Sequence, residues 1–278
     1  MTLKHMTMTT PTHLILVCCH AIYLDGTSHG ANEDEWLLAP FQSGEVPTFT
    51  QHIKAGLSLL SSTPSSLLVF SGSKTRCETQ KSEAQSYLDL CFDNEFWSIF
   101  EGDEERSEGK GVLLSRVVLE EQALDSFGNF AFGILKFWKE TGQWPQKITV
   151  VSHEFKRARF MDLHAKAARW PQDCVEFVGI DPTYMANGGT EWDEERTASV
   201  LRGERERGYR VWADDLWGAG EVLRGKRRGR NCWDVGQCWF KNEEERVRSG
   251  VKSRVVRDGE HGMEEEFLID DKQPWEIS

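Results

Sequence analysis

The sequence lacks a long apolar run and lacks an excess of positive charge. Its most apolar early stretch, residues 14–19, continues only patchily to Leu24, which is too short to cross a bilayer. The flanks have neither the basic region nor the small-residue cleavage site of a secretion signal. The 278 residues include 33 Lys and Arg against 45 Asp and Glu, a formal net charge of -12 that would repel a nucleic acid. We therefore expect a cytoplasmic protein with no membrane span and no nucleic-acid partner.

The seven cysteines lack the spacing of a zinc finger. Cys18 and Cys19 are adjacent within an apolar run, where buried thiols behave as small apolar side chains. Cys232 and Cys238 have no second Cys or His pair at a suitable spacing. We expect a reducing compartment and no structural zinc site.

Common nucleotide-binding and hydrolase motifs are also absent. Residues 72–75 read GSKT, but the first glycine of a Walker A motif would fall at Leu67, inside a predicted strand. No G-x-G-x-x-G follows the first predicted strand, and the chain contains no H-E-x-x-H. Any site must therefore be built from residues that are far apart in the sequence.

The sequence does contain an alternation of predicted strands and helices. Five short runs rich in Val, Ile, Leu and Phe have the near-continuous apolarity of strands covered on both faces: residues 14–19, 67–70, 112–119 (with a shorter strand inside), 148–151 and 175–180. Apolar stripes at helical spacing occupy residues 47–60, 78–91, 124–138 and 154–170. This order predicts a three-layer α/β domain over residues 11–187, with a parallel sheet of about five strands.

The remainder of the chain differs in composition. Residues 188–240 contain a charged helical pattern at 191–207 and several tryptophans, which are seldom left in water. We expect this extension to pack on the α/β domain rather than to form a second core. Residues 1–10 and 241–278 are rich in Glu, Arg and Lys and are expected to be mobile for much of their length.

Two charged runs have local interpretations. Residues 101–111 are expected to form a solvated loop rather than a domain boundary. Residues 224–230, RGKRRGR, could be a nuclear-import or RNA-binding patch, but the acidic balance of the whole chain favours a structural or solvated stretch.

Polar residues follow every predicted strand. In open parallel sheets, ligands bind beyond the carboxyl ends of the strands, where helix N-termini favour anions. The residues at these positions are His20, Asp25 and 26–28 after the first strand, 71–76 after the second, Glu120 and Glu121 after the third, Ser152 and His153 after the fourth, and Asp181 after the fifth. His153 and Arg157 are four apart, as are Asp125 and Asn129, so each pair would project from one side of a helix start.

We predict that these residues line one polar crevice. His153, Glu83 and Glu120 are the predicted proton-transfer groups. A histidine suits that task because its pKa is close to neutral pH. The predicted substrate-binding residues are Asp25, Ser71, Gly72, Lys74, Arg76, Ser126, Asn129, Ser152 and Arg157. If Arg157 lies beside His153, repulsion would push His153 toward its neutral form.

Each of these residues also has a local interpretation as a turn, a helix cap or a surface ion pair. An oxygen-rich metal site made of Asp25, Glu83, Glu120 and His153 is conceivable, but no ligand spacing supports it. We therefore predict no metal.

The same residues resemble a family of unknown function that includes the bacterial proteins SanA, ElyC and YdcF. The resemblance covers roughly residues 13–182 and rests on several motifs in order: Asp25-Gly26, Ser71-Gly72-Ser73, Ser82-Glu83-Ala84, Glu121 through Asp125-Ser126 to Asn129, and Ser152-His153 with Arg157-Ala158. Residues 215–218, DLWG, and the basic residues after them are similar to the larger eukaryotic-type members. The resemblance implies a Rossmann-like fold and a suspected enzymatic activity. Since YdcF is reported to bind S-adenosylmethionine, it also makes that molecule a candidate cofactor.

Three functions follow as hypotheses. The leading one is a small-molecule enzyme, a hydrolase or group-transfer catalyst acting on an anionic or nucleotide-like substrate. The second is a non-catalytic binder of S-adenosylmethionine or a nucleotide, since neither Ser71 nor Ser152 has an evident base in the sequence. The third is an interaction protein whose Trp-rich extension is the working surface.

Overall fold

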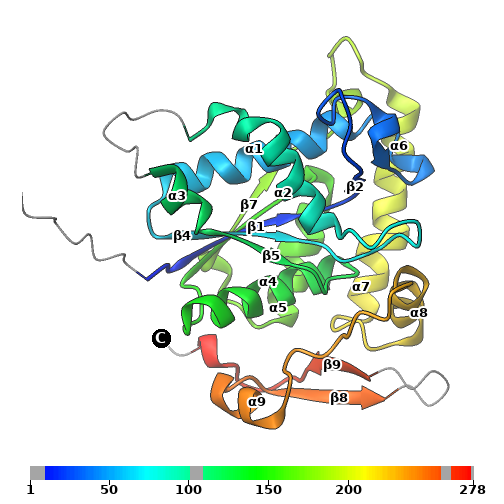
Figure 1. The fold of residues 1–278 in the computed structure, drawn as a ribbon. Helices are drawn as coiled ribbons and strands as arrows, with labels where there is room; N and C mark the ends of the chain where they lie inside the picture. Colours follow the sequence, from blue (N-terminus) through cyan, green and yellow to red (C-terminus); the bar gives the residue numbers. More distant parts are fainter. Residues whose placement is uncertain (1–9, 101–108, 258–263, 277–278) are drawn as a thin grey trace, which may run out of the picture.

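The computed structural model describes residues 10–100, 109–257 and 264–276, and its centre is a five-stranded parallel sheet (Figure 1). The strands are β1 (His13–Cys18), β4 (Ser66–Ser71), β5 (Val117–Glu120), β6 (Lys147–Ser152) and β7 (Val175–Gly179), in the order β5-β4-β1-β6-β7. All four pairings between neighbours are parallel. The predicted α/β fold with a parallel sheet of five strands is therefore confirmed.

Helices cover both faces of the sheet (Figure 1). On one face α1 (Val46–Ser62) and α2 (Glu83–Asp93) pack against Ile15 and Val17 of β1. On the other face α4 (Ser126–Thr141) and α5 (Ala165–Ala167) pack against Leu14 and Leu16, because successive strand residues point to opposite faces. The helices approach β1 closely: a Cβ atom at Gly56 would lie 2.5 Å from Val17 Cγ2, and one at Gly133 would lie 2.5 Å from Leu16 Cδ1.

The smaller elements complete the domain. The further strands are β2 (Ile22–Tyr23), β3 (Trp36–Leu37), β8 (Ser253–Arg257) and β9 (Glu264–Leu268). The further α-helices are α3 (Gly109–Leu114), α6 (Glu194–Gly203), α7 (Arg210–Asp214), α8 (Glu221–Arg230) and α9 (Glu243–Ser249). Short 3-10 helices span Glu33–Glu35, Pro40–Gln42, Glu95–Ser98, Glu154–Lys156, Gln172–Cys174, Thr183–Met185 and Pro274–Glu276, and π-helical segments span Arg159–His164 and Glu204–Tyr209.

Two local predictions differ from these elements. The predicted helix over residues 154–170 is divided into a 3-10 turn, a π-helical segment and the short α5. In the predicted loop 101–111, residues 101–108 lie outside the described residues and the last three begin α3.

The Trp-rich extension packs on α4, as predicted. Trp212 lies 5.8 Å from Phe127 between ring centroids, and Trp239 lies 6.0 Å from Phe132. Both tryptophans belong to the core that contains α4 and Leu14 of β1. The extension therefore shares the core of the α/β domain.

The segment after residue 240, expected to be largely mobile, is instead folded where the structure describes it. It forms α9 and the antiparallel hairpin of β8 and β9, with Phe267 and Leu268 buried. The physical reason is that its charges have partners: the fully buried Glu266 carboxylate accepts hydrogen bonds from Arg246 and from the Trp239 amide. Residues 1–9, 258–263 and 277–278 lie outside the described residues.

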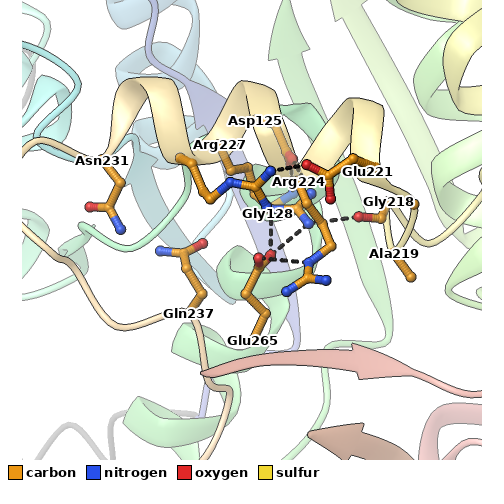
Figure 2. Close-up of polar contacts among 12 residues, drawn as sticks. Asp125, Gly128, Gly218, Ala219, Glu221, Arg224, Arg227, Asn231, Gln237 and Glu265 are labelled. Atoms are coloured by element: carbon orange, nitrogen blue, oxygen red, sulfur yellow. Dashed lines mark hydrogen bonds and ion pairs between the residues drawn. The ribbon is translucent and has the colours of Figure 1, made fainter. Parts of the chain in front are cut away.

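The basic run 224–230 forms most of α8 and has a structural role (Figure 2). The buried Arg227 donates to Asp125 Oδ2 at 2.8 Å, to Glu265 Oε2 at 2.6 Å and to the Gly218 carbonyl at 2.6 Å. Asp125 also caps α4 by accepting from the Gly128 amide at 2.7 Å. Arg227 thus joins α8, the start of α4 and strand β9, which supports the structural interpretation of this run.

Two of the seven cysteines form a disulfide, whereas we expected a reducing compartment. Cys77, in the loop after β4, forms a disulfide with Cys232, which follows α8, across a Cα–Cα distance of 5.4 Å. The partners are separated by 155 residues, so no local spacing indicated the pair. Cys18, Cys19 and Cys91 are buried free thiols.

The search for membrane-spanning helices gave a negative result. Within residues 10–100, 109–257 and 264–276, no helix is both long enough and apolar enough to cross a bilayer.

Candidate functional site

The site lies where the chain reverses direction across the sheet. The strand order is β5-β4-β1-β6-β7, so the chain passes from β1 to β4 and β5 on one side, and from β6 to β7 on the other side. The boundary between β1 and β6 is therefore the topological switch point, where ligands bind in such sheets. His20 follows β1, and Ser152 and His153 end and follow β6. The Ser152 hydroxyl lies 3.3 Å from His20 Nε2. The two strand ends therefore meet, as predicted from the sequence.

Three histidines gather at this switch point. His20, His52 of α1 and His153 each offer a ring nitrogen, and the three nitrogens lie within 4.8 Å of one another. The ring centroids of His153 lie 4.5 Å from His20 and 4.9 Å from His52. His52 and His153 are 0% and 2% exposed.

Sequence reasoning identified His153 but did not assign a role to His52. The helical stripe of α1 was recognised from its apolar residues Ile53, Leu57 and Leu60. A signal for His52 was present, because it precedes Ile53 on the same buried face, where a polar residue needs a partner.

A second layer of polar atoms surrounds the histidines. His52 Nε2 donates to the Ile180 carbonyl at 2.9 Å, beyond the end of β7. Glu45, at the start of α1, places Oε2 3.4 Å from His153 Nε2 and accepts a hydrogen bond from the Tyr184 hydroxyl at 2.9 Å. Glu45 is 4% exposed, and burial raises the pKa of its carboxyl.

The imidazoles are held in their neutral form. Burial is the main cause that lowers the pKa of His20 and of His153 well below the usual value, and the charge of Lys156 lowers both further. Burial, followed by the neighbouring His153, has the same effect on the pKa of His52. At neutral pH these imidazoles are therefore uncharged, and each has a lone pair available.

The cations that influence His153 are Lys156 and Arg159, not Arg157 as we expected. Arg157 is 44% exposed and donates to both carboxylate oxygens of Glu154 and to the Phe177 carbonyl, so its donors are directed away from His153. Lys156 and Arg159 take its place, because the turn after β6 is a 3-10 helix followed by a π-helical segment rather than a regular α-helix.

Lys156 is a site residue that sequence reasoning missed. Its Nζ lies 3.5 Å from His20 Nδ1. Burial, then the charge of Arg159, lowers the pKa of this lysine to about 8. Lys156 also interacts electrostatically with Glu83 and Glu45, and its charge lowers the pKa of both carboxyls.

The predicted carboxylates gather at the ends of β4 and β5. Glu120 is 4% exposed and accepts from the Ser71 hydroxyl at 2.5 Å and from the amides of Gln122 and Ala123 at 2.5 and 3.1 Å. Burial raises its pKa to about 7.

Glu83 packs directly against the backbone of the strand end. Its Oε1 accepts from the Thr75 hydroxyl at 2.6 Å, and burial raises its pKa. A Cβ atom at Gly72 would lie 2.7 Å from Glu83 Oε2 and 2.9 Å from Cys19 Cβ, so a larger residue there would displace the carboxylate. Ser71, Gly72, Glu83 and Glu120 thus lie together beyond the ends of β4 and β5.

Other predicted binding residues have local partners. Asp25 is 63% exposed and pairs with Lys81 at 3.0 Å, outside the crevice. Ser126 lies 2.8 Å from Nε2 of the buried His164. Asn129 is buried beside the Cys18 thiol. Lys74 and Arg76 are partly buried in the loop after β4, and Arg76 interacts electrostatically with Glu83.

Fold and site together define a parallel α/β protein with a histidine- and carboxylate-lined switch point, of the doubly wound class. The chain is 29% identical over 301 residues to YOR238W, an uncharacterized protein of Saccharomyces cerevisiae. The match covers 94% of this chain and 96% of the yeast protein, so it includes most of the C-terminal extension. Neither a protein-family model nor a solved structure matches the chain.

Proposed function

We propose that the protein is a small-molecule enzyme of the YdcF/SanA type, a hydrolase or group-transfer catalyst that acts on an anionic or nucleotide-like substrate. The observation that carries this proposal is Lys156, a cation with a lowered pKa that lies 3.5 Å from His20 and interacts electrostatically with the buried Glu83. Perturbed titratable groups concentrated at a switch point are typical of catalytic sites.

Substrate binding rests on cations that face the carboxylates. Lys156, Arg76 and the exposed Arg230 all interact electrostatically with Glu83, and Arg159 is only 13% exposed. An anionic group that binds here would meet Lys156 and Arg76, which are partly buried, so ion pairing with them is stronger than in water.

Proton transfer rests on groups that titrate near neutrality or stay neutral there. Glu120 has a pKa of about 7 and can exchange a proton under ordinary conditions. His153 is a neutral imidazole and can accept one. A correctly positioned acid or base of this kind contributes on the order of 10²- to 10⁴-fold in rate.

The test is turnover of a panel of nucleotides and phosphate esters by the purified protein, with Lys156→Met and Arg157→Met as a matched pair. The two cations are adjacent in sequence, but Arg157 pairs with Glu154 at the surface. We expect Lys156→Met to reduce kcat/KM by roughly 100-fold or more, and Arg157→Met to leave it within about twofold. Equal losses in both variants, or no turnover of any panel member, would contradict the proposal.

The alternative is a non-catalytic binder of S-adenosylmethionine or a nucleotide. It is favoured by the burial of Ser71 and Ser152, both 0% exposed, since a buried hydroxyl is poorly placed to attack a substrate. Calorimetry with S-adenosylmethionine distinguishes the two functions. Tight binding without product formation supports this alternative, and turnover excludes it.

A further inference from the structure

We propose that His20, His52 and His153 form a binding site for a divalent transition-metal ion, with Zn²⁺ as the preferred ion. This site goes beyond the proposed function, although the two share the switch point. It consists of three imidazoles from three separate elements, whose ring nitrogens lie within 4.8 Å of one another. In a tetrahedral zinc site with Zn–N bonds of about 2.0–2.1 Å, the nitrogens are roughly 3.3 Å apart. The rings must therefore close by about 1 to 2 Å.

The orientation of the rings fits ligands of a metal. A metal-bound histidine usually directs its second ring nitrogen to a carbonyl, a carboxylate or a similar oxygen, which fixes the ring and its tautomer. In all three rings Nε2 faces such an oxygen: Ser152 Oγ at 3.3 Å from His20, the Ile180 carbonyl at 2.9 Å from His52, and Glu45 Oε2 at 3.4 Å from His153. Nδ1 is then the atom that each ring has available for a metal.

The hydrogen-bond inventory supports the same assignment. His52 Nδ1 and both ring nitrogens of His153 are buried without a hydrogen-bond partner. The Ile180 carbonyl can only accept, so His52 Nε2 carries the hydrogen and its Nδ1 presents a lone pair. Buried polar atoms without partners are uncommon in folded proteins, and a bound cation would satisfy the Nδ1 lone pairs of His52 and His153.

The third ring, His20, already has a cation near the nitrogen that would bind a metal. His20 Nδ1 faces Lys156 Nζ at 3.5 Å, so the ammonium occupies the direction that a metal would take. Metal binding must move this side chain, and the charge of the nearby Glu45 carboxylate offsets part of the repulsion. Removing the ammonium should therefore strengthen metal binding.

The ligand set indicates the kind of ion. Three imidazoles with a nearby carboxylate suit Zn²⁺ and other late first-row ions, whereas Mg²⁺ and Ca²⁺ prefer oxygen ligands. The oxygen-rich combination of Asp25, Glu83, Glu120 and His153 is not the one that the structure assembles, because Asp25 pairs with Lys81 at the surface.

The experiment measures Zn²⁺ and Co²⁺ binding to the full chain, by metal analysis after desalting and by visible absorption of the Co²⁺ form. The variants are His52→Asn and His153→Asn, with His164→Asn as the control. His164 is equally buried and also has an unpartnered Nδ1, but it lies outside the three-histidine cluster. Circular dichroism in EDTA checks the fold of each variant.

We expect one Zn²⁺ per chain in the wild type and the control, and a tetrahedral Co²⁺ spectrum without thiolate charge transfer. His52→Asn and His153→Asn should weaken binding by at least about 100-fold, the upper range for loss of an outer-shell partner. Lys156→Met should tighten it. Absence of Zn²⁺ binding, a thiolate band, or equal affinity in cluster and control variants would overturn the assignment. If one cluster variant does not fold, the other variant and the wild-type Co²⁺ spectrum still decide.

Metal binding and catalysis are separable in these measurements. His153 is shared by the two proposals, but His52 belongs only to the metal site, and the proposed function is tested by turnover in Lys156→Met and Arg157→Met, neither of which removes a ligand. A chain that turns over nucleotides but binds no Zn²⁺ would overturn the metal site alone.

Discussion

Glu120 shows how one residue links the fold to its chemistry. Its carboxylate receives three hydrogen bonds at the end of β5, yet burial still raises its pKa to about 7. The neighbouring Glu121 adds a smaller repulsion in the same direction. Because the folded-state pKa exceeds the ordinary value, folding favours the protonated form. The associated stability is complete below about pH 4.5 and is lost as the pH rises through about 7.

This linkage predicts the behaviour of Glu120→Gln. The neutral amide can accept from the same backbone amides and donate to the Ser71 hydroxyl, so the fold should be retained. Urea unfolding at about pH 5 and about pH 8 should show that the wild type loses roughly 3 kcal/mol more than the variant between the two conditions. Parallel pH profiles for the two proteins would show that Glu120 ionises normally in the fold.

Residues of the site could be predicted from the sequence only where they end or follow an apolar strand. His153, Ser152, Ser71 and Glu120 directly follow or end apolar strands, and the sheet then brings them to one edge. His52 and Glu45 come from α1 and its start, where no strand end marks them. Lys156 was missed for another reason: the choice between it and Arg157 depends on the shape of one helical turn, which sequence spacing alone does not fix.

The secondary structure elements were likewise predictable only where burial determines their sequence pattern. Strands β1, β4 and β6 could be predicted because both of their faces are buried, which makes them largely apolar. The hairpin of β8 and β9 could not, because its strands carry charged residues whose partners, such as Arg227 for Glu265, lie elsewhere in the chain. Composition alone therefore made a folded segment resemble a mobile tail.

Arg227 is expected to be the most important ionic residue of α8. Arg227→Met leaves the Asp125 and Glu265 carboxylates, 10% and 3% exposed, without their shared cation. Breaking a buried pair from one side typically costs about 3–5 kcal/mol, which chemical denaturation would detect. As a control, Lys147→Met removes a surface pair with Glu176 and should cost less than about 1 kcal/mol. Similar values for both variants would mean that the α8 network contributes little.

At the scale of the whole molecule, the C-terminal extension is part of the core. Phe127, Phe132 and Trp138 of α4 pack against Trp212, Trp239 and Phe240 of the extension. An extension that served only as a partner surface would leave these α4 side chains covered by the α/β domain itself.

Deleting residues 189–278 tests this arrangement. Each uncovered aromatic side chain forfeits about 1.5–3 kcal/mol, and several together approach the whole stability of an ordinary domain. We expect the truncated chain to lose cooperative thermal unfolding and to bind a hydrophobic dye. A sharp unfolding transition with native circular dichroism in the truncated chain would instead support a separable partner surface.

The bridge between Cys77 and Cys232 closes more than half of the polypeptide into a covalent ring that includes β5, α4, β6 and β7. Beside it, the Trp233 indole donates to the Arg76 carbonyl, so the loop after β4 is fastened to the extension at two adjacent points. A protease that cuts the backbone once inside the ring would therefore release no fragment until a reductant is added. The loop after β4 and the start of the segment after α8 are therefore expected to move together.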